Sequence, residues 1–303
     1  AKFVAEDVKK NLSSKTVSLK IFDKKMIEKE KMNLFLSVNS GSAYEPRLVH
    51  LTYTPAKKTK NMKHLCLVGK GVTFDTGGYS LKPATSMVNM KYDMAGSATV
   101  YGAFRAAVLQ ECPHKISCFM VLTDNAINSM ATKPDSIVIG RNGKSVEILN
   151  TDAEGRLILA DVLDYACDLK PDAIVDVATL TGACLVALGS EICGLMSNCE
   201  KLTEEIKNAA KTKNEYVWQL PIIEEFRNDV KADIADLRNM AKTSFGGTPK
   251  AAAFLENFIK NDISWVHLDI AGIGDSQSHL SYCQPKGASG LIIRTLHTWL
   301  MSK

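Results

Sequence analysis

The sequence predicts an α/β protein in which a mixed, mostly parallel central sheet is sandwiched between helices. The short apolar run at residues 65–68 is typical of a buried strand, and residues 173–178 are expected to form another strand. Helical and strand patterns alternate along this part of the chain, and parallel strands need such crossover helices. The 303 residues are 46% hydrophobic and 23% charged, which is enough apolar material for one large core.

The first part of the chain predicts short elements of both kinds. In order, they are an amphipathic helix over 1–12, an alternating strand over 16–22, a polar helical segment from Asp23, strands over 33–38 and 47–53, and a lysine-rich hairpin loop over 55–63.

The remainder predicts the β-α-β order that gives a parallel sheet covered on both faces. The expected strands are 65–68, 116–122, a run ending at Leu149, 173–178 and 265–270. The expected helices are 94–110, 154–168, a stretch opened by residues 179–183, 200–211, 222–228, 250–261 and 288–301, with a polar loop over 124–142.

Charge and cysteine usage exclude several functional classes. The net charge is +4 with acids and bases interspersed, so nucleic-acid binding is not indicated. No apolar run approaches the roughly 18 residues that span a bilayer, and the first residues do not resemble a signal peptide, so a cytoplasmic protein is expected. The eight cysteines and six histidines lack Cys-x-x-Cys and His-x-x-x-His spacing. A metal site must therefore rest mainly on carboxylates.

Two clusters of charged residues carry the candidate chemistry. The octapeptide Asn-Thr-Asp-Ala-Glu-Gly-Arg-Leu at 150–157 follows an apolar run and holds Asp152, Glu154 and Arg156. In an extended chain the two carboxylates point to the same side and repel unless a cation lies between them. The second cluster begins where strand 65–68 ends in a glycine-rich turn, and comprises Lys70, Asp75, Lys82 and Asp93.

The four carboxylates suffice for two divalent ions that share bridging oxygens, and oxygen ligands suit Mg²⁺, Mn²⁺ or Zn²⁺. Surface ion pairs and caps remain an alternative, with Asp152 capping the next helix and Arg156 pairing with Glu154. Residues 69–71 also suggest a phosphate loop, but the Walker spacing of glycines and the following Ser or Thr are missing.

The octapeptide and five further blocks resemble the leucyl aminopeptidase family of cytosolic-type, two-metal aminopeptidases. The matching blocks are residues 68–75, 80–82, 93–94, 178–182 and 268–272, and the resemblance covers about residues 33–303. It implies an aminopeptidase/phosphorylase-like three-layer catalytic domain, a homohexamer and peptides with a free N-terminus as substrates. Membrane and nucleic-acid partners are not expected.

The resemblance also implies a role for each matched residue. One metal would be held by Asp75, Asp152 and Glu154 and the other by Lys70, Asp75, Asp93 and Glu154. A hydroxide bridging the metals would attack, Lys82 would stabilise the gem-diolate, and Arg156 would bind bicarbonate as general base. The substrate site would prefer peptides whose N-terminal residue is apolar, such as leucine. It would comprise Lys82, Met90, Asp93, Thr179, Leu180, Gly182 and Ala271.

The sequence departs from the family in two places. Residues 124–129 lack the proline and glycine of the family's loop before the octapeptide, and residues 133–136 lack the glycine of the family's Pro-Gly-Asp segment. Family members also have an N-terminal domain, so residues 1–32 are expected to be a linker helix and strand left from it, and 33–303 the two-metal catalytic domain. Two other functions remain open, a two-metal phosphoesterase and a non-catalytic DNA-binding relative.

Overall fold

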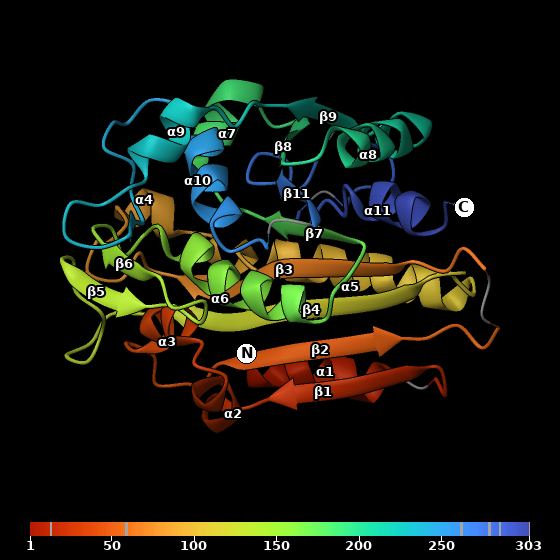
Figure 1. Cartoon of the computed structure of the whole chain (residues 1–303), viewed down its shortest axis with the longest axis horizontal. Coiled ribbons are helices and arrows are strands. Elements are labelled where there is room, and N and C mark those ends of the chain that lie inside the picture. Colours follow the sequence, from red (N-terminus) through yellow and green to blue (C-terminus); the bar gives the residue numbers. More distant parts are fainter. Residues whose placement is uncertain (13, 58–59, 261–262, 278–279, 285, 303) are drawn as a thin grey trace.

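A computed structural model describes residues 1–302 except 13, 58–59, 261–262, 278–279 and 285. Its centre is an eight-stranded mixed sheet with the order β1-β2-β4-β3-β7-β11-β8-β9 (Figure 1). Four of the seven strand pairs are parallel, and the central strands β4, β3, β7 and β11 all run in the same direction. The predicted fold class is therefore confirmed.

The strands and helices have the following bounds. The eight strands of the central sheet are β1 (Val17–Phe22), β2 (Arg47–Tyr53), β3 (His64–Asp75), β4 (Lys115–Asn125), β7 (Ala173–Ala178), β8 (Ile192–Ser197), β9 (Tyr216–Gln219) and β11 (Ser264–Asp269). A second sheet has the order β10-β6-β5 and contains β5 (Ser136–Ile139), β6 (Ser145–Ile148) and β10 (Leu237–Arg238).

Helices cover both faces of the central sheet. They are α1 (Lys2–Asn11), α2 (Lys24–Lys29), α3 (Asn33–Asn39), α4 (Ala84–Met87), the 3₁₀ helix η1 (Met90–Tyr92), α5 (Ala95–Leu109), α6 (Glu154–Asp168), α7 (Gly182–Leu188), α8 (Glu200–Thr212), α9 (Glu224–Asp229), α10 (Gly247–Glu256) and α11 (Ile293–Leu300). None of the helices in the described ranges is long and apolar enough to cross a membrane.

The core consists of two apolar layers, one on each face of the sheet. Side chains of β3 point alternately into the two layers, with Leu65 and Leu67 in one layer and Cys66 and Val68 in the other. Helices α1, α5, α8 and α11 supply the first layer, and α3, α6 and α10 supply the second. All six residues of β7, including Asp176, are buried, as expected for a strand at the sheet centre with both faces covered.

Residues 33–38, predicted as a strand, form helix α3 instead, so this prediction is wrong. Short apolar runs do not distinguish a strand from a buried helix. Here Leu34, Phe35 and Val38 pack in the layer that α6 also supplies, and the Phe35 N–H donates to Asp161 Oδ2 of α6 at 3.0 Å. That carboxylate satisfies a backbone donor in the first turn of α3 from a distant part of the chain.

The connection over residues 55–63 is not a hairpin, because β2 pairs with β1 and β4 and not with β3. Residues 58–59 of this connection, and residue 261 of the predicted helix 250–261, lie outside the described residues. The predicted polar loop 124–142 contains β5, and the run ending at Leu149 forms β6 of the small sheet. Strands β8 and β9 were not predicted.

We expect the Asp161→Asn variant to become more stable relative to the wild-type protein as the pH rises from about 4 to 7. Burial raises the pKa of Asp161 from 3.8 to about 7 in the folded protein. The folded state therefore retains a proton that the unfolded chain releases. The stability contributed by this group is complete below pH 4 and lost as the pH rises through 7, by at most about 4 kcal/mol. Urea unfolding of both proteins across this pH range measures the difference, and a pH-independent difference contradicts the expectation.

Candidate metal and catalytic site

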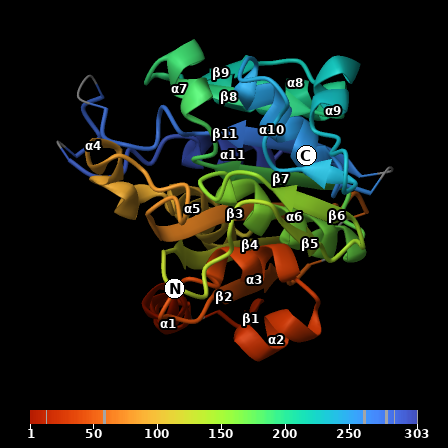
Figure 2. The ribbon, with the colours of Figure 1, turned by 90° about the vertical axis from the view of Figure 1, so that its left-hand side faces the viewer.

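The predicted site residues meet at the carboxyl edge of the parallel strands. This edge is on the left in Figure 1 and faces the reader in Figure 2. Lys70 and Asp75 lie on β3, which is irregular between Val72 and Asp75 where it pairs with β4. Asp93 follows η1, and Glu154 is the first residue of α6. Ligand sites of α/β sheets commonly form at this edge.

Lys70 lies between two carboxylates that come from different segments. Its Nζ is 2.9 Å from Asp93 Oδ2 and 2.8 Å from Glu154 Oε1, and it donates to the Thr179 carbonyl at 2.8 Å. All four residues are buried. Lys70 therefore joins the segment after η1, the start of α6 and the end of β7 at one point.

Lys82 makes the equivalent contacts to the other two carboxylates. Its Nζ is 2.8 Å from Asp75 Oδ2 and 2.6 Å from Asp152 Oδ1. Asp75 is buried, whereas the Asp152 side chain retains 31% of its exposure. The Lys82 contacts thus lie at the more open side of the cluster.

The cluster fits divalent cations. Ligand oxygens of Asp75, Asp93 and Glu154 lie within 4.8 Å of one another. Asp93 Oδ2, Asp152 Oδ1 and Glu154 Oε1 are buried, and the only partner of each among the described residues is a lysine Nζ at ion-pair distance, so each oxygen keeps a further lone pair. Four carboxylates surround two ammonium groups, so negative charge is in excess. Buried oxygens with free lone pairs and excess negative charge are what a hard cation requires.

The pKa shifts show how strongly these charges depend on one another. Burial and neighbouring carboxylates raise the pKa of Asp93 and of Glu154, while Lys70 opposes both shifts. Burial would lower the pKa of Lys70, but the charges of Asp93 and Glu154 raise it above its usual value. The Lys70 amine could bind a metal ion only after it has lost its proton, because only the neutral amine has a lone pair.

The Asp152 cap and the Arg156–Glu154 ion pair of the alternative are wrong, although the carboxylates do form ion pairs with Lys70 and Lys82. Helix α6 begins after Ala153 without a side-chain cap, and Asp152 contacts Lys82 instead. Arg156 makes no ion pair among the described residues; its Nη1 donates to the Asn239 carbonyl at 2.8 Å. Glu154 faces Lys70 at the N-terminus of α6, where the helix dipole favours a carboxylate.

The glycine of the octapeptide has a steric role. A Cβ atom on Gly155 would lie 2.9 Å from Cδ, Cε and Nζ of Lys70. Any larger residue at this position would push the Lys70 side chain away from the first turn of α6. Gly155 therefore permits the contact between Lys70 and Glu154.

Arg156 is buried beside the metal cluster. Burial lowers the pKa of Arg156 to about 10, an effect that the charges of Glu154 and Asp269 oppose. Its Nε is buried and has no hydrogen-bond partner, so a donor remains for an anion.

The predicted substrate residues adjoin the cluster. Thr179 Oγ1 donates to Asp93 Oδ1 at 2.6 Å, and Met90 lies in η1, three residues before Asp93. The N–H groups of Leu180 and Ala271 both donate to Asp269 Oδ1 at 3.1 Å. Gly182 begins α7 with open space at its Cβ position.

Three buried residues of this region were missing from the predicted site. Asn125, at the end of β4, donates through Nδ2 to Asp75 Oδ1 at 2.9 Å and to the Thr151 carbonyl at 3.0 Å. Asp269 accepts the bonds described above, and Asn239 contacts the octapeptide. Asp269 lies in a motif block that the sequence had singled out, whereas neither asparagine carries a signal beyond its residue type.

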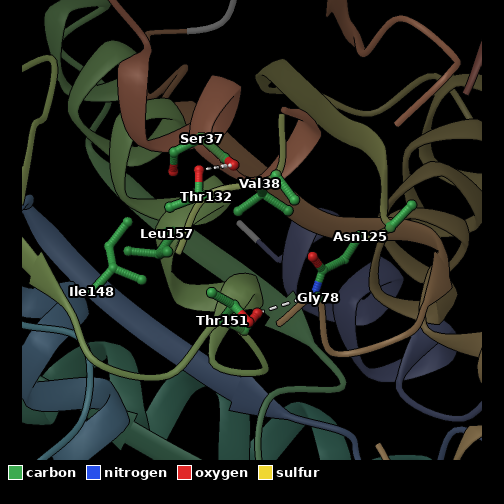
Figure 3. A pocket seen from close by; sticks show the side chains of 10 residues that line it. Ser37, Val38, Gly78, Asn125, Thr132, Ile148, Thr151 and Leu157 are labelled. Carbon is green, nitrogen blue, oxygen red and sulfur yellow. Dashed lines mark hydrogen bonds between the residues drawn. The ribbon is translucent and has the colours of Figure 1, made fainter. Parts of the chain in front are cut away.

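A small cavity lies against the octapeptide but contains none of the predicted site residues (Figure 3). Asn125 and Thr151, joined by the bond between Asn125 Nδ2 and the Thr151 carbonyl, line one part of it, and Ser37 and Thr132 line another. Its lining is mostly apolar, which makes it a packing gap behind the site.

Comparison with known proteins gives a consistent result. The profile of the cytosol aminopeptidase family, catalytic domain, matches residues 1–297, a match that begins before residue 33. A probable cytosol aminopeptidase of Prochlorococcus marinus is 45% identical to the chain, and the match covers 92% of the chain and 56% of the relative. A probable cytosol aminopeptidase of Persephonella marina is 43% identical, and the match covers 94% of the chain and 56% of the relative. That of Aquifex aeolicus is 43% identical over 98% of the chain and 60% of its own length. The chain thus spans a little over half the length of these curated relatives.

Proposed function

Because this chain belongs to the cytosol aminopeptidase family, we propose that it is a metallo-exopeptidase that releases N-terminal amino acids from peptides. The observation that carries the proposal is the buried convergence of Asp75, Asp93 and Glu154 beside two lysines. Such a cluster is costly to bury unless it serves a bound cation or a reaction. The phosphoesterase and DNA-binding alternatives have no specific observation in their favour.

Two divalent cations, Zn²⁺, Mn²⁺ or Mg²⁺, fit this ligand set. One cation would be held by Asp75, Asp152 and Glu154, with the Asp152 carbonyl contributing, and the other by Lys70, Asp75, Asp93 and Glu154. When bound, they would polarise the scissile carbonyl and lower the pKa of a water molecule. Asp75 and Glu154 would belong to both sites, and the contact of each with a lysine fixes its orientation beforehand.

Lys82 would stabilise the negative charge that develops on the scissile carbonyl oxygen. Burial would lower the pKa of Lys82, but the carboxylates of Asp75 and Asp152 raise it above its usual value, so the side chain stays cationic. An ammonium group at the open side of the cluster would supply the positive charge that this oxygen requires.

Arg156 would hold a bicarbonate ion, which would supply a general base. The free Nε of the buried guanidinium supports this role, because a buried donor without a partner favours an acceptor anion.

The free amine and side chain of the first residue would bind beside Asp93 and Thr179, with the Leu180 carbonyl orienting the substrate. Met90, Gly182 and Ala271 would complete an apolar pocket that prefers leucine. The bond from the Tyr92 hydroxyl to the Ala271 carbonyl, 3.3 Å long, supports this grouping because it joins η1 to the turn after β11.

A homohexamer in the cytoplasm is the assembly and location that family membership favours. Relatives carry the name cytosol aminopeptidase, which supports the location. Mass measurement in solution tests the assembly.

We expect the purified chain to release leucine from a leucyl chromogenic amide. Chelator should abolish turnover, and Mn²⁺ or Zn²⁺ should restore it. An N-acetylated leucyl amide is the matched control substrate and should not be cleaved, because the proposal requires a free amine. Absence of turnover with saturating metal from neutral to alkaline pH would sink the proposal, and metal-dependent cleavage of a phosphoester instead would favour the phosphoesterase.

A further inference from the structure

We propose that Asn239 is a positioning residue that holds the octapeptide in the conformation needed for metal binding, an inference that rests on the proposed function. Asn239 is fully buried and directly follows β10. It lies more than 80 residues from the octapeptide in sequence, and its own N–H donates to the Glu147 carbonyl of β6 at 3.0 Å. The pairing of β10 with β6 thus brings it to the octapeptide.

The Asn239 side chain binds the backbone at the beginning of the octapeptide on both of its polar atoms. Its Oδ1 accepts from Leu149 N–H at 2.8 Å and Asn150 N–H at 3.3 Å. Its Nδ2 donates to the Asn150 carbonyl at 2.6 Å, with a longer contact of 3.5 Å to the Ala153 carbonyl. An amide is the side chain that can satisfy N–H groups and carbonyls at once.

These hydrogen bonds act on the predicted metal-binding carboxylates indirectly, through one intervening residue in each case. The Asn150 side chain accepts a hydrogen bond from the Asp152 N–H at 2.8 Å, so fixing the Asn150 backbone also fixes the turn that carries Asp152. Ala153, the other contact, immediately precedes Glu154 and α6. Asn239 therefore acts on the two carboxylates that the octapeptide contributes.

The main chain of Asn239 acts on the third charged residue of the octapeptide. Its carbonyl accepts the Arg156 Nη1 hydrogen at 2.8 Å and leaves Nε without a partner. One residue thus sets the positions of Asp152, Glu154 and Arg156 together. Residues that orient metal ligands typically change metal affinity or activity by 10- to 100-fold when removed.

The test compares Asn239→Ala with Asn198→Ala in the full 303-residue chain. Asn198 is the matched control, because its amide also bridges an N–H and a carbonyl, those of Trp265 and Ile263 at 2.8 and 3.1 Å, but it touches no predicted site residue. Mn²⁺ affinity is measured by competition with a chelator, and kcat at saturating Mn²⁺. Asn239→Ala should weaken Mn²⁺ binding and lower kcat by about 10- to 100-fold. Asn198→Ala should leave both within about threefold of wild type.

Asn239→Asp is the second variant, since it keeps the shape and the acceptor of the side chain. It replaces the amide that donates to the Asn150 and Ala153 carbonyls by a carboxyl group, whose protonated form, favoured by burial, keeps one donor. Its Mn²⁺ affinity should therefore fall between those of Asn239→Ala and the wild type. It also serves if Asn239→Ala does not fold. Wild-type Mn²⁺ affinity and kcat in the folded Asn239 variants overturn the inference, as does an equal loss in Asn198→Ala. If the wild-type protein binds Mn²⁺ but cleaves no peptide, the proposed function is refuted, whereas the inference about Asn239 is still tested by Mn²⁺ affinity.

Discussion

Replacing Glu154 by glutamine is expected to abolish peptide hydrolysis, because Glu154 is proposed to bridge both cations. The substitution preserves the shape of the side chain and its place at the start of α6, but it removes the negative charge that faces Lys70 at 2.8 Å. Loss of a bridging carboxylate removes several kcal/mol of metal-dependent transition-state stabilisation, which corresponds to a decrease in kcat of roughly a thousandfold. Metal content and kcat measured on the same sample test this expectation.

A suitable control for Glu154→Gln is Glu215→Gln. Glu215 is also buried, but it accepts hydrogen bonds from Thr295 N–H and Oγ1 at 3.1 and 2.6 Å on the α11 side of the molecule. The control should lose stability, since it removes the ion pair between Glu215 and Arg294, yet retain bound metal and wild-type kcat. Metal binding and kcat near wild type in Glu154→Gln would contradict the assigned role of this carboxylate.

Replacing Lys82 by methionine is expected to lower kcat by about 10²- to 10³-fold while leaving metal binding intact or stronger. The first effect follows from the loss of the cation that stabilises the oxyanion. The second follows because the Lys82 ammonium pairs with Asp75 and Asp152 and so competes with cations for the same oxygens. Opposite effects on kcat and metal affinity distinguish Lys82 from a metal ligand.

Competition of chelator with Mn²⁺ and steady-state kinetics measure the two effects in the Lys82→Met protein. Lys144→Met is the control, because Lys144 donates to Asn257 Oδ1 at 2.9 Å and contacts none of the site residues. Weaker metal binding in Lys82→Met would indicate that Lys82 organises the carboxylates, and an unchanged kcat would remove it from the reaction.

Some elements of the fold could be predicted from the sequence, and others could not. Strand β7 was predicted because all of its residues except Asp176 are apolar. Helix α3 was missed because its pattern over six residues fits either period, and its packing against α6 decided the outcome. Strands β8 and β9 were missed although their sequences are largely apolar or aromatic, because short apolar runs do not by themselves distinguish a strand from a helix.

The candidate site shows the same division. Lys70, Asp75, Lys82, Asp93, Asp152 and Glu154 could all be named from the sequence, because their types and motif spacing match one family, and the structure brings them together. Their metal and catalytic roles, and the division of the chain at residue 33, stay predictions. Asn125 and Asn239 could not be named, since each acts through hydrogen bonds to backbone groups of distant residues.

The sequence by itself determined the chemistry of this protein, namely which carboxylates, lysines and arginine are present and which fold class can carry them. Residue type and spacing are local properties, and they suffice to identify a family. Only the tertiary structure decided how each lysine is shared between carboxylates and which asparagines hold the octapeptide. Those contacts join residues between 7 and 90 positions apart, and their geometry exists only after the strands have paired and the helices have packed.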